Sequence, residues 1–169
     1  MKSLLFRLLI WGGVLGCSQG GMTPEEKLAM LLPDALPTIP VTGQVLVDGA
    51  PVKDIWVYLV PKGTEIPKGE QPATRARTDE QGNFAMTTYM EGDGAPQGDY
   101  VVCMEWLRFR QTGGMWIGPD KLGKKYSDPK TSTWEVTVVS EDVKLPTFEL
   151  STSGVTVPAA KGGAGKPRK

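Results

Sequence analysis

The sequence predicts an all-β domain, a sandwich built from seven short strands, and three observations lead to this prediction. Between residues 41 and 150 the apolar residues come in short runs, several of which alternate with polar residues as half-buried strands do. Clusters of Gly, Pro and acidic residues separate the runs and are typical of turns. The same stretch has no apolar pattern with the period of a helix. Short strands joined by turns in this way are typical of β-sandwiches.

One short helix is expected ahead of the strands, within the segment TPEEKLAMLLP. Thr23 suits the N-cap, Pro24 suits the first helical position, and Glu26 stands three residues after the cap, as in a capping box. Pro33 ends the helix, and residues 33–40 then form an extended spacer. The apolar side of the helix consists of Leu28, Met30, Leu31 and Leu32. Because a helix of about two turns is marginal alone, we expect it to pack on the domain or on a membrane surface.

The first two strands flank a turn with the sequence Asp-Gly-Ala-Pro at residues 48–51. In the first strand, Val45 and Val47 alternate with polar neighbours, as in a strand with one buried face. The next run, residues 55–60, is apolar or aromatic at every position. Since successive side chains of a strand point to opposite faces, this run predicts a central strand that is covered on both faces.

The remaining strands follow a polar loop. Two short strands flank a turn at residues 79–82, and a longer strand begins at residue 99. Residues 107–133 are expected to form a long insertion rich in Gly and Lys, after which alternation returns at Trp134 and a last strand carries Phe148. The predicted core consists of Val45, Val47, Val57, Leu59, Phe84, Tyr100, Val102, Val136, Val138 and Phe148.

The first sixteen residues have the composition of an export signal, because Lys2 and Arg7 supply charge and residues 4–15 are otherwise apolar. The apolar run is shorter than the ~20 residues of a membrane-spanning helix. The tetrapeptide VLGC at residues 14–17 resembles the lipobox of bacterial lipoproteins. This resemblance implies that the chain is cleaved before Cys17 and that the Cys17 thiol carries lipid. The alternative is an ordinary secreted protein with a cysteine near its cleavage site.

A lipidated Cys17 defines where the protein is expected to work. Several acyl chains on one residue anchor a protein stably, whereas a single chain is marginal. By analogy with the sorting of such lipoproteins, Ser18 at the next position favours the outer membrane. The expected partners are therefore the membrane, through the N-terminal lipid, and an envelope protein or polysaccharide.

The charge distribution argues against a nucleic-acid partner. The chain has 19 basic and 19 acidic residues. Two of the basic residues lie in the signal and four in the C-terminal tail, which leaves 13 basic against 19 acidic residues in between, a balance of −6. Proteins that follow a phosphate backbone need the opposite balance.

The inventory of reactive side chains is small. The chain has no histidine, which removes the commonest general base and the commonest zinc ligand. With Cys17 acylated, Cys103 has no disulfide partner, and its place in the run DYVVCMEW predicts a buried, inert thiol. We therefore expect no metal, no cofactor and no enzymatic activity.

Three weaker chemical hypotheses concern acids and hydroxyls. The loop acids suggest calcium ligands, but they lack EF-hand spacing, and solvated turn residues explain them better; they are Asp79, Glu80, Glu91, Asp93 and Asp99. Glu105 and Glu135 could form a glycosidase pair, but both alternate with apolar residues and are expected to face outward. The third hypothesis is a Ser-Lys site, which the spacing disfavours, and it involves Lys125, Ser127 and Ser132.

Several segments together resemble the carboxypeptidase regulatory-like domain over residues 41–150. They are GQVLVDGAPVKDIWVYLVP, RTDEQGNFAM and GAPQGDYVVCMEW, and KKYSDPKTSTWEVTV resembles a segment of bacterial lipoproteins that carry this domain. The matching positions are Gly43, Val45, Asp48, Gly49, Pro51, Pro61, Thr78, Asp79, Gly82, Phe84, Pro96, Gly98, Tyr100 and Val102. The resemblance implies a transthyretin-like, Greek-key β-sandwich and a non-catalytic accessory role. The matched residues shape turns and core, and a buried Tyr100 hydroxyl needs a hydrogen-bond partner.

The expected organisation has four parts: a signal peptide at 1–16, a tether with the short helix at 17–40, the sandwich at 41–152 and a flexible basic tail at 153–169. Aromatic and basic residues around the insertion suit a protein partner or a sugar. These candidate binding residues are Trp106, Arg108, Phe109, Arg110, Trp116 and Tyr126. The competing interpretation is that Trp106 belongs to the core and that Trp116 pins the loop.

Three classes of function follow from these observations. The first is a non-catalytic, lipid-anchored module of the cell envelope with a binding or structural role. The second is a carbohydrate-binding lipoprotein that uses the aromatics of residues 107–133. The third, a hydrolase, is disfavoured by the missing histidine and the missing acid pair.

Overall fold

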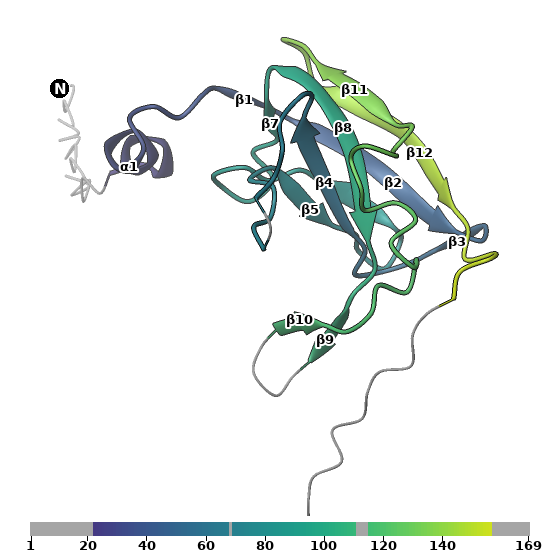
Figure 1. The fold of residues 1–169 in the computed structure, drawn as a ribbon. Coiled ribbons are helices and arrows are strands. Elements are labelled where there is room, and N and C mark those ends of the chain that lie inside the picture. Colours follow the sequence, from purple (N-terminus) through teal and green to yellow (C-terminus); the bar gives the residue numbers. More distant parts are fainter. Residues whose placement is uncertain (1–21, 68, 111–114, 157–169) are drawn as a thin grey trace, which may run out of the picture. The chain divides into compact units, whose positions relative to one another are not determined.

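The computed structural model describes residues 22–67, 69–110 and 115–156 (Figure 1). The chain divides into two units, Met1–Ala35 and Leu36–Lys169. The predicted signal, Cys17 and most of the predicted tail lie outside the described residues. The all-β prediction is confirmed, since the described part of the second unit consists of strands, turns and loops.

The described part of the first unit contains helix α1 (Pro24–Leu31), which begins with the expected capping box. The Thr23 hydroxyl accepts a hydrogen bond from the Glu26 amide at 3.1 Å, and the Thr23 amide donates to the Glu26 carboxylate at 2.7 Å. The helix buries none of its residues. The capping box and Pro24, which are local features of the sequence, were sufficient to predict this helix.

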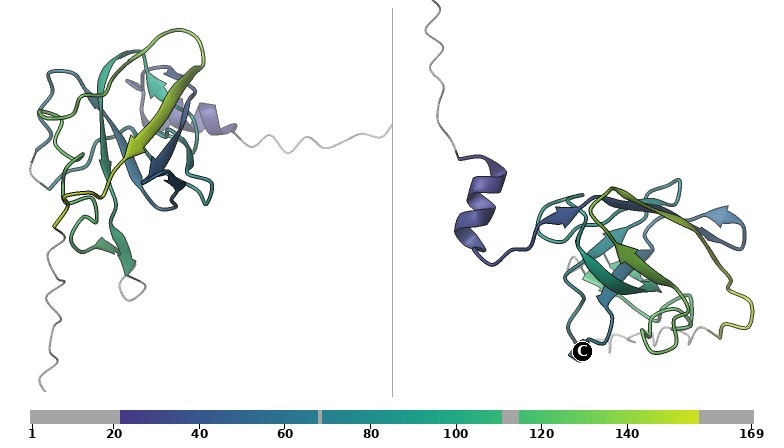
Figure 2. Two further views of the ribbon diagram at one scale, coloured as in Figure 1. Left: turned by 90° about the vertical axis from the view of Figure 1, so that its right-hand side faces the viewer. Right: turned by 90° about the horizontal axis from the view of Figure 1, so that it is seen from above.

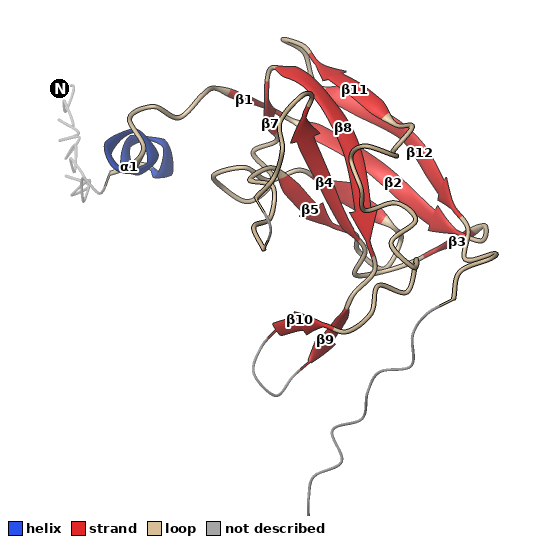
Figure 3. Ribbon diagram, viewed as in Figure 1, coloured by secondary structure: helices blue, strands red, loops and turns tan. Residues whose placement is uncertain are grey.

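The first sheet has four strands in the order β11–β8–β4–β5, each antiparallel to its neighbours (Figure 3). Their bounds are β4 (Trp56–Pro61), β5 (Arg75–Arg77), β8 (Gly98–Glu105) and β11 (Glu135–Val138). Strand β4 lies between β8 and β5, which is the central position that its apolar sequence predicts.

The second sheet is organised around β2, which pairs with β12 on one side and with β3 and β6 on the other. The bounds are β2 (Val41–Val47), β3 (Ala50–Pro51), β6 (Asn83–Ala85) and β12 (Val143–Leu150). The β2–β12 pair is parallel, and its register shifts between Lys144 and Thr147. Pro146 lies in that interval. The shift is the irregularity expected of a residue that cannot donate to a β-ladder.

Two small pairs complete the described strands. Strand β1 (Thr38–Ile39) pairs with β7 (Ala95–Pro96), and β9 (Arg108–Arg110) pairs with β10 (Met115–Ile117). All seven expected strands have a counterpart, and β1, β3, β7, β9 and β10 are added to them. These segments have two or three residues, too few to produce a readable alternation of apolar and polar positions.

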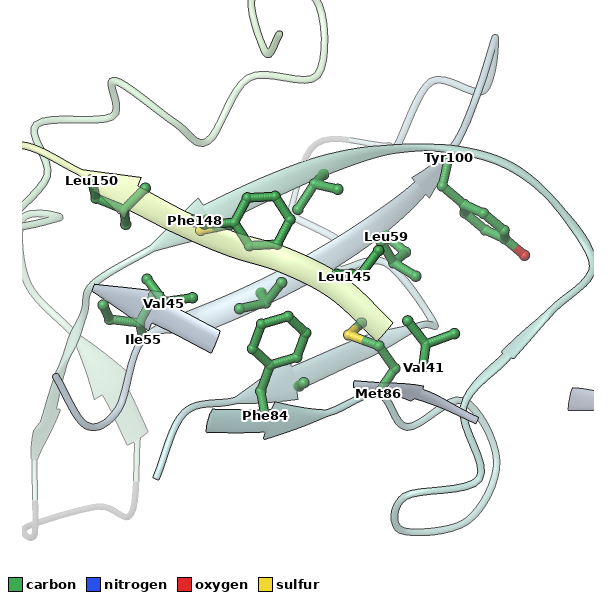
Figure 4. Packing of buried hydrophobic residues seen from close by; sticks show 14 of the residues in the cluster. Val41, Val45, Ile55, Leu59, Phe84, Met86, Tyr100, Leu145, Phe148 and Leu150 are labelled. Carbon is green, nitrogen blue, oxygen red and sulfur yellow. The ribbon is translucent and has the colours of Figure 1, made fainter. Parts of the chain in front are cut away.

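The two four-stranded sheets share one hydrophobic core (Figure 1, and from two further sides Figure 2). Nine of the ten predicted core residues are buried, and Val136 is half-buried. Additional core residues, several of which Figure 4 labels, are Val41, Ile55, Met86, Met104, Leu122, Leu145 and Leu150. Each fully buried aliphatic side chain contributes about 1.5–3 kcal/mol relative to exposure.

Strand β4 also contributes to a second, smaller cluster on the other face of its sheet. Val57 and Leu59 lie in the shared core, whereas Tyr58 and Val60 pack with Cys103 on the opposite face. The prediction of a strand covered on both faces is confirmed.

The predicted turn before β6 is held by its own side chains. The Asp79 carboxylate accepts hydrogen bonds from the amides of Gln81 at 2.9 Å and Asn83 at 2.8 Å. The buried Thr78 hydroxyl accepts from the Ile55 amide at 2.9 Å and donates to the Val52 carbonyl at 2.7 Å. The turn is thereby joined to the segment that leads into β4.

Tyr100 finds the hydrogen-bond partner that its burial requires. Its hydroxyl donates to the Pro96 carbonyl at 2.8 Å. Because β7 ends at Pro96 and β8 begins at Gly98, this bond fixes the bend between the two strands.

We predict that Gly82→Ala destabilises the fold by at least about 1 kcal/mol more than Gly49→Ala. Both glycines have positive φ, 74° and 80°, so both substitutions strain the backbone. An added Cβ at Gly82 would lie 2.3 Å from the Val45 carbonyl oxygen, whereas nothing lies within 4 Å at Gly49. Urea denaturation of the two variants measures the difference, and equal losses would contradict the packing argument.

Candidate ligand-binding cleft

The six predicted binding residues do not all have described side chains. Phe109 and Arg110 lie in β9 and Trp116 in β10, where Trp116 is the register partner of Phe109. Their side chains lie outside the part of the chain that the structure describes, and Arg108 is exposed. The insertion therefore contains a hairpin that the sequence did not reveal.

Trp106 packs at the edge of the shared core. It is half-buried, and the Lys121 ammonium lies 4.0 Å from its ring centroid. Burial lowers the pKa of Lys121, and Arg108 adds to this effect. One face of the Trp106 ring is thus already occupied by a cation from the same chain.

Tyr126 also has a packing role. Its ring stacks on Trp134 with centroids 5.4 Å apart, and it contacts the core. Its hydroxyl accepts a hydrogen bond from the Ser151 amide at 2.9 Å and donates to the Ser151 carbonyl at 3.3 Å. These contacts join the insertion to the end of β12, and the binding role of the six residues stays a prediction.

Asp120 is a key residue that the sequence analysis missed. Its buried carboxylate accepts hydrogen bonds from the amides of Trp106 at 2.8 Å, Leu122 at 3.0 Å and Lys124 at 2.9 Å. The signal was present, because an Asp after Gly-Pro is a typical turn former. Asp120 holds residues 120–124 against the end of β8.

A cleft of about 620 Å³ lies on the face of the first sheet that points away from the shared core. We call it the outer-face cleft. Residues 63–67 and 70–72 form one wall, and residues 127–130 form the other. The floor comes from β4 and β8 and consists of Tyr58, Val60, Val101, Cys103 and Glu105. A mostly apolar floor with a few polar groups is typical of ligand sites.

The Cys103 thiol in this floor is buried, as predicted. Burial raises its pKa to about 11, and the carboxylates of Asp128 and Glu105 add to that effect. Because the thiolate is the reactive form, the thiol serves as an apolar part of the floor at neutral pH.

Glu105 is the polar group at one end of the floor. It is half-buried, and its carboxylate lies 3.5 Å from the Tyr58 hydroxyl, which donates to it. Burial is the main cause of its raised pKa and the Asp120 carboxylate a second one, while the Tyr58 hydroxyl and Lys124 oppose them. Burial and Glu105 in turn raise the pKa of Tyr58.

Glu105 and Glu135 do not face each other as a catalytic pair. Glu135 is opposite Val101 in the register, four residues from Glu105 and so roughly 13 Å along β8. Its exposed carboxylate accepts a hydrogen bond from Lys62 at 2.8 Å. Both carboxylates lie on the outer face of the sheet, as expected, but only Glu105 reaches the cleft, where it is half-buried.

The two walls of the outer-face cleft meet at an ion pair. The Lys130 ammonium lies 2.8 Å from the Glu65 carboxylate, and both side chains are exposed. This hydrogen-bonded contact lowers the pKa of Glu65 and raises that of Lys130. Exposed ion pairs are screened by salt and contribute little, so this pair adds little to the contact between the walls.

Most of the loop acids and hydroxyls considered for chemistry have structural partners. The Asp93 carboxylate accepts hydrogen bonds from the amides of residues 88–90, and the Asp99 carboxylate accepts one from the Thr137 hydroxyl. The hydroxyls of Ser127 and Ser132 donate to backbone carbonyls. Within the described ranges, no three His, Cys, Asp or Glu residues are grouped so as to hold a metal ion. In those ranges, too, no helix is long and apolar enough to span a bilayer.

Comparison with known proteins gives no family. No protein-family model and no curated protein matches the chain. Among solved structures, a 9R-lipoxygenase from Cyanothece PCC8801 aligns at 13% identity with a TM-score of 0.36. The alignment covers 68% of this chain and 16% of that protein. A TM-score this low defines no shared fold, so the likeness carries no argument.

We predict that Asp120→Ala destabilises the fold by about 3 kcal/mol, because it leaves partly buried amides without their charged acceptor. The matched control is Asp128→Ala, which removes an exposed carboxylate that accepts from the Lys130 amide. That control is expected to cost less than about 1 kcal/mol. Thermal unfolding of both variants measures the difference, and similar losses would show that Asp120 does not hold the insertion.

We predict that Glu105→Gln stabilises the protein at neutral pH. A carboxyl whose pKa is raised by folding destabilises the folded state once the pH exceeds that pKa. The gain in the free energy of unfolding of Glu105→Gln should therefore be absent below the pKa of Glu105 in the unfolded state. It should grow as the pH rises through the pKa of Glu105 in the folded state. Urea denaturation between about pH 4 and 8 tests this. The control Glu135→Gln, which loses only the exposed contact with Lys62, should show no such gain.

Proposed function

We propose that this protein is a non-catalytic binding module of the bacterial cell envelope, held to a membrane by lipid on Cys17. The observation that carries the binding role is the outer-face cleft, with its volume of about 620 Å³ and its largely apolar floor. Cavities of this size and lining are typical sites for small ligands and short chain segments.

The anchoring part of the proposal rests on the sequence. Residues 1–16 have the features of an export signal, and VLGC at 14–17 resembles a lipobox. The stretch between Cys17 and the β domain, which was expected to extend to residue 40 but ends before β1 at Thr38, then serves as a tether, and Ser18 favours the outer membrane. In this arrangement the lipid positions the β domain near the membrane, where its ligand is met.

We further propose that the β domain is a transthyretin-like, Greek-key sandwich of the carboxypeptidase regulatory-like kind. Three features support this. The two sheets share a core, and the long strands β2 and β12, from opposite ends of the domain, pair in parallel. The matching positions Asp79 and Gly82 also form the tight turn expected of them.

The non-catalytic part is supported by what the reactive groups contact. The Cys103 thiol is buried with a pKa of about 11, and the Glu135 carboxylate binds Lys62. The carboxylates of Asp79, Asp93 and Asp120 accept hydrogen bonds from backbone amides in turns. The last three carboxylates stabilise loops.

The carbohydrate alternative places the ligand on the aromatics of residues 107–133. Of the four candidate aromatics, Trp106 next to this insertion and Phe109, Trp116 and Tyr126 within it, two already have packing partners, since Trp106 carries Lys121 over its ring and Tyr126 stacks on Trp134. The proposal therefore assigns binding to the outer-face cleft. Retention of envelope polysaccharide that Trp116→Ala abolishes, in a variant that still folds, would overturn this assignment.

We predict that Cys17→Ser abolishes labelling of the protein by palmitate in bacterial cells and releases it from the membrane fraction. Cys103→Ser is the matched control, because it removes the other cysteine from a buried position in the β domain. That control should be labelled and fractionate like the unaltered chain. If Cys17→Ser still partitions with membranes to the same extent, the lipid anchor is refuted.

A further inference from the structure

The two ends of the outer-face cleft differ chemically, because its floor changes from apolar residues to an acidic residue along two paired strands. Val60 is the register partner of Val101, and Tyr58 is the partner of Cys103. The row ends at Glu105, two residues beyond Cys103 on β8. Residues two apart in a strand lie on the same face, roughly 7 Å from each other. The floor thus presents an apolar surface with a carboxylate about 7 Å from its centre.

The lining of the cleft also contains more acidic than basic side chains. Among the described residues that line it, the acidic and basic side chains other than Tyr58 and Cys103 are four carboxyl groups and one amine. The carboxylates belong to Glu65, Glu70, Glu105 and Asp128, and the ammonium to Lys130. Charge complementarity therefore favours a cationic ligand and disfavours an anionic one.

From these two features we infer that the outer-face cleft binds an extended peptide segment in which a lysine or arginine stands two residues from an apolar residue. This inference deepens the binding function proposed above. Side chains two apart in an extended peptide point to the same side at the spacing of the floor. The basic group meets Glu105 while the apolar side chain lies over the floor at Cys103, about 7 Å along β8, beside the half-buried Val101.

Glu105 is the group that gains most from such a ligand. It is half-buried, and burial disfavours its charged form. Its hydrogen bond from the Tyr58 hydroxyl is long, at 3.5 Å. A ligand ammonium or guanidinium provides the opposite charge and the short hydrogen bonds that a partly buried carboxylate requires.

The rim ion pair provides a route of entry that selects for cations. Lys130 already binds Glu65 across the two walls, with both side chains exposed. A basic ligand can take the place of Lys130 on Glu65, so that one exposed ion pair is exchanged for another. An acidic ligand has no such exchange and meets the carboxylates of Glu70 and Asp128 instead.

The test uses the full chain in detergent and three acetylated, amidated tetrapeptides: Lys-Ser-Leu-Ser, Glu-Ser-Leu-Ser and Lys-Ser-Ser-Ser. Binding is followed by the NMR shifts of the methyl groups of Val60 and Val101. We expect Lys-Ser-Leu-Ser to shift these methyls and to bind at least about tenfold more tightly than either control peptide, a difference of about 1.4 kcal/mol. Its affinity should fall as the salt concentration rises.

The deciding variant is Glu105→Gln, which we expect to weaken Lys-Ser-Leu-Ser binding at least about tenfold. Because the same change is predicted to stabilise the fold at neutral pH, a loss of binding cannot be attributed to unfolding. Glu135→Gln, on the same sheet but outside the cleft, should bind like the unaltered chain. Lys130→Ala should bind the probe more tightly, since it removes the competing ammonium from Glu65.

Several results would overturn the inference. The first three are equal binding of the Lys and Glu peptides, unchanged affinity in Glu105→Gln, and methyl shifts confined to residues outside the cleft. The fourth is binding of n-hexylamine, an amine with an alkyl chain but no peptide backbone, as tight as that of Lys-Ser-Leu-Ser. The anchor is tested separately, since Cys17 takes no part in peptide binding. A chain that binds the probe but is not labelled at Cys17 refutes the anchor alone. A labelled chain that does not bind it refutes the peptide inference alone.

Discussion

The two-sided burial of β4 is the constraint on which both the core and the cleft depend. Val57 and Leu59 anchor the strand in the core that the two sheets share, and this places Tyr58 and Val60 on the opposite face, in the floor of the cleft. Because side chains alternate strictly, a slip of one residue would exchange the two sets. The packing that stabilises the domain therefore also determines the shape and chemistry of its outer face.

Buried polar groups in turns place the loops around this framework. Thr78 joins the turn before β6 to the segment entering β4, and Asp120 holds the insertion against the end of β8. Each satisfies several backbone groups at once, which is the condition under which burying a polar side chain costs little. The same engagement explains why Asp79 and Asp93, which suggested calcium ligands, support their loops.

The outer-face cleft differs from the core in what closes it. Its floor is rigid sheet, but its walls are loops joined across the rim by the exposed pair of Glu65 and Lys130. Segments with few buried contacts open most easily, whereas the floor keeps its apolar row and the single half-buried carboxylate of Glu105. A floor of paired strands between walls of loops suits a ligand that lies along the strands, and the acidic residues around it favour a ligand with positive charge.

What the sequence by itself determined about this protein is local. The capping box of Thr23 and Glu26, the turn at Asp79–Gly82, the double-sided strand and the burial of Cys103 all follow from residues close together in the chain. Tertiary structure alone decided that Glu105 is half-buried, that Asp120 reaches back to Trp106, and that Glu65 meets Lys130 from 65 residues away. The physical reason is that alternation specifies which face a side chain occupies, but not which distant loop covers that face. The loops that cover this face of the sheet form the walls of the cleft.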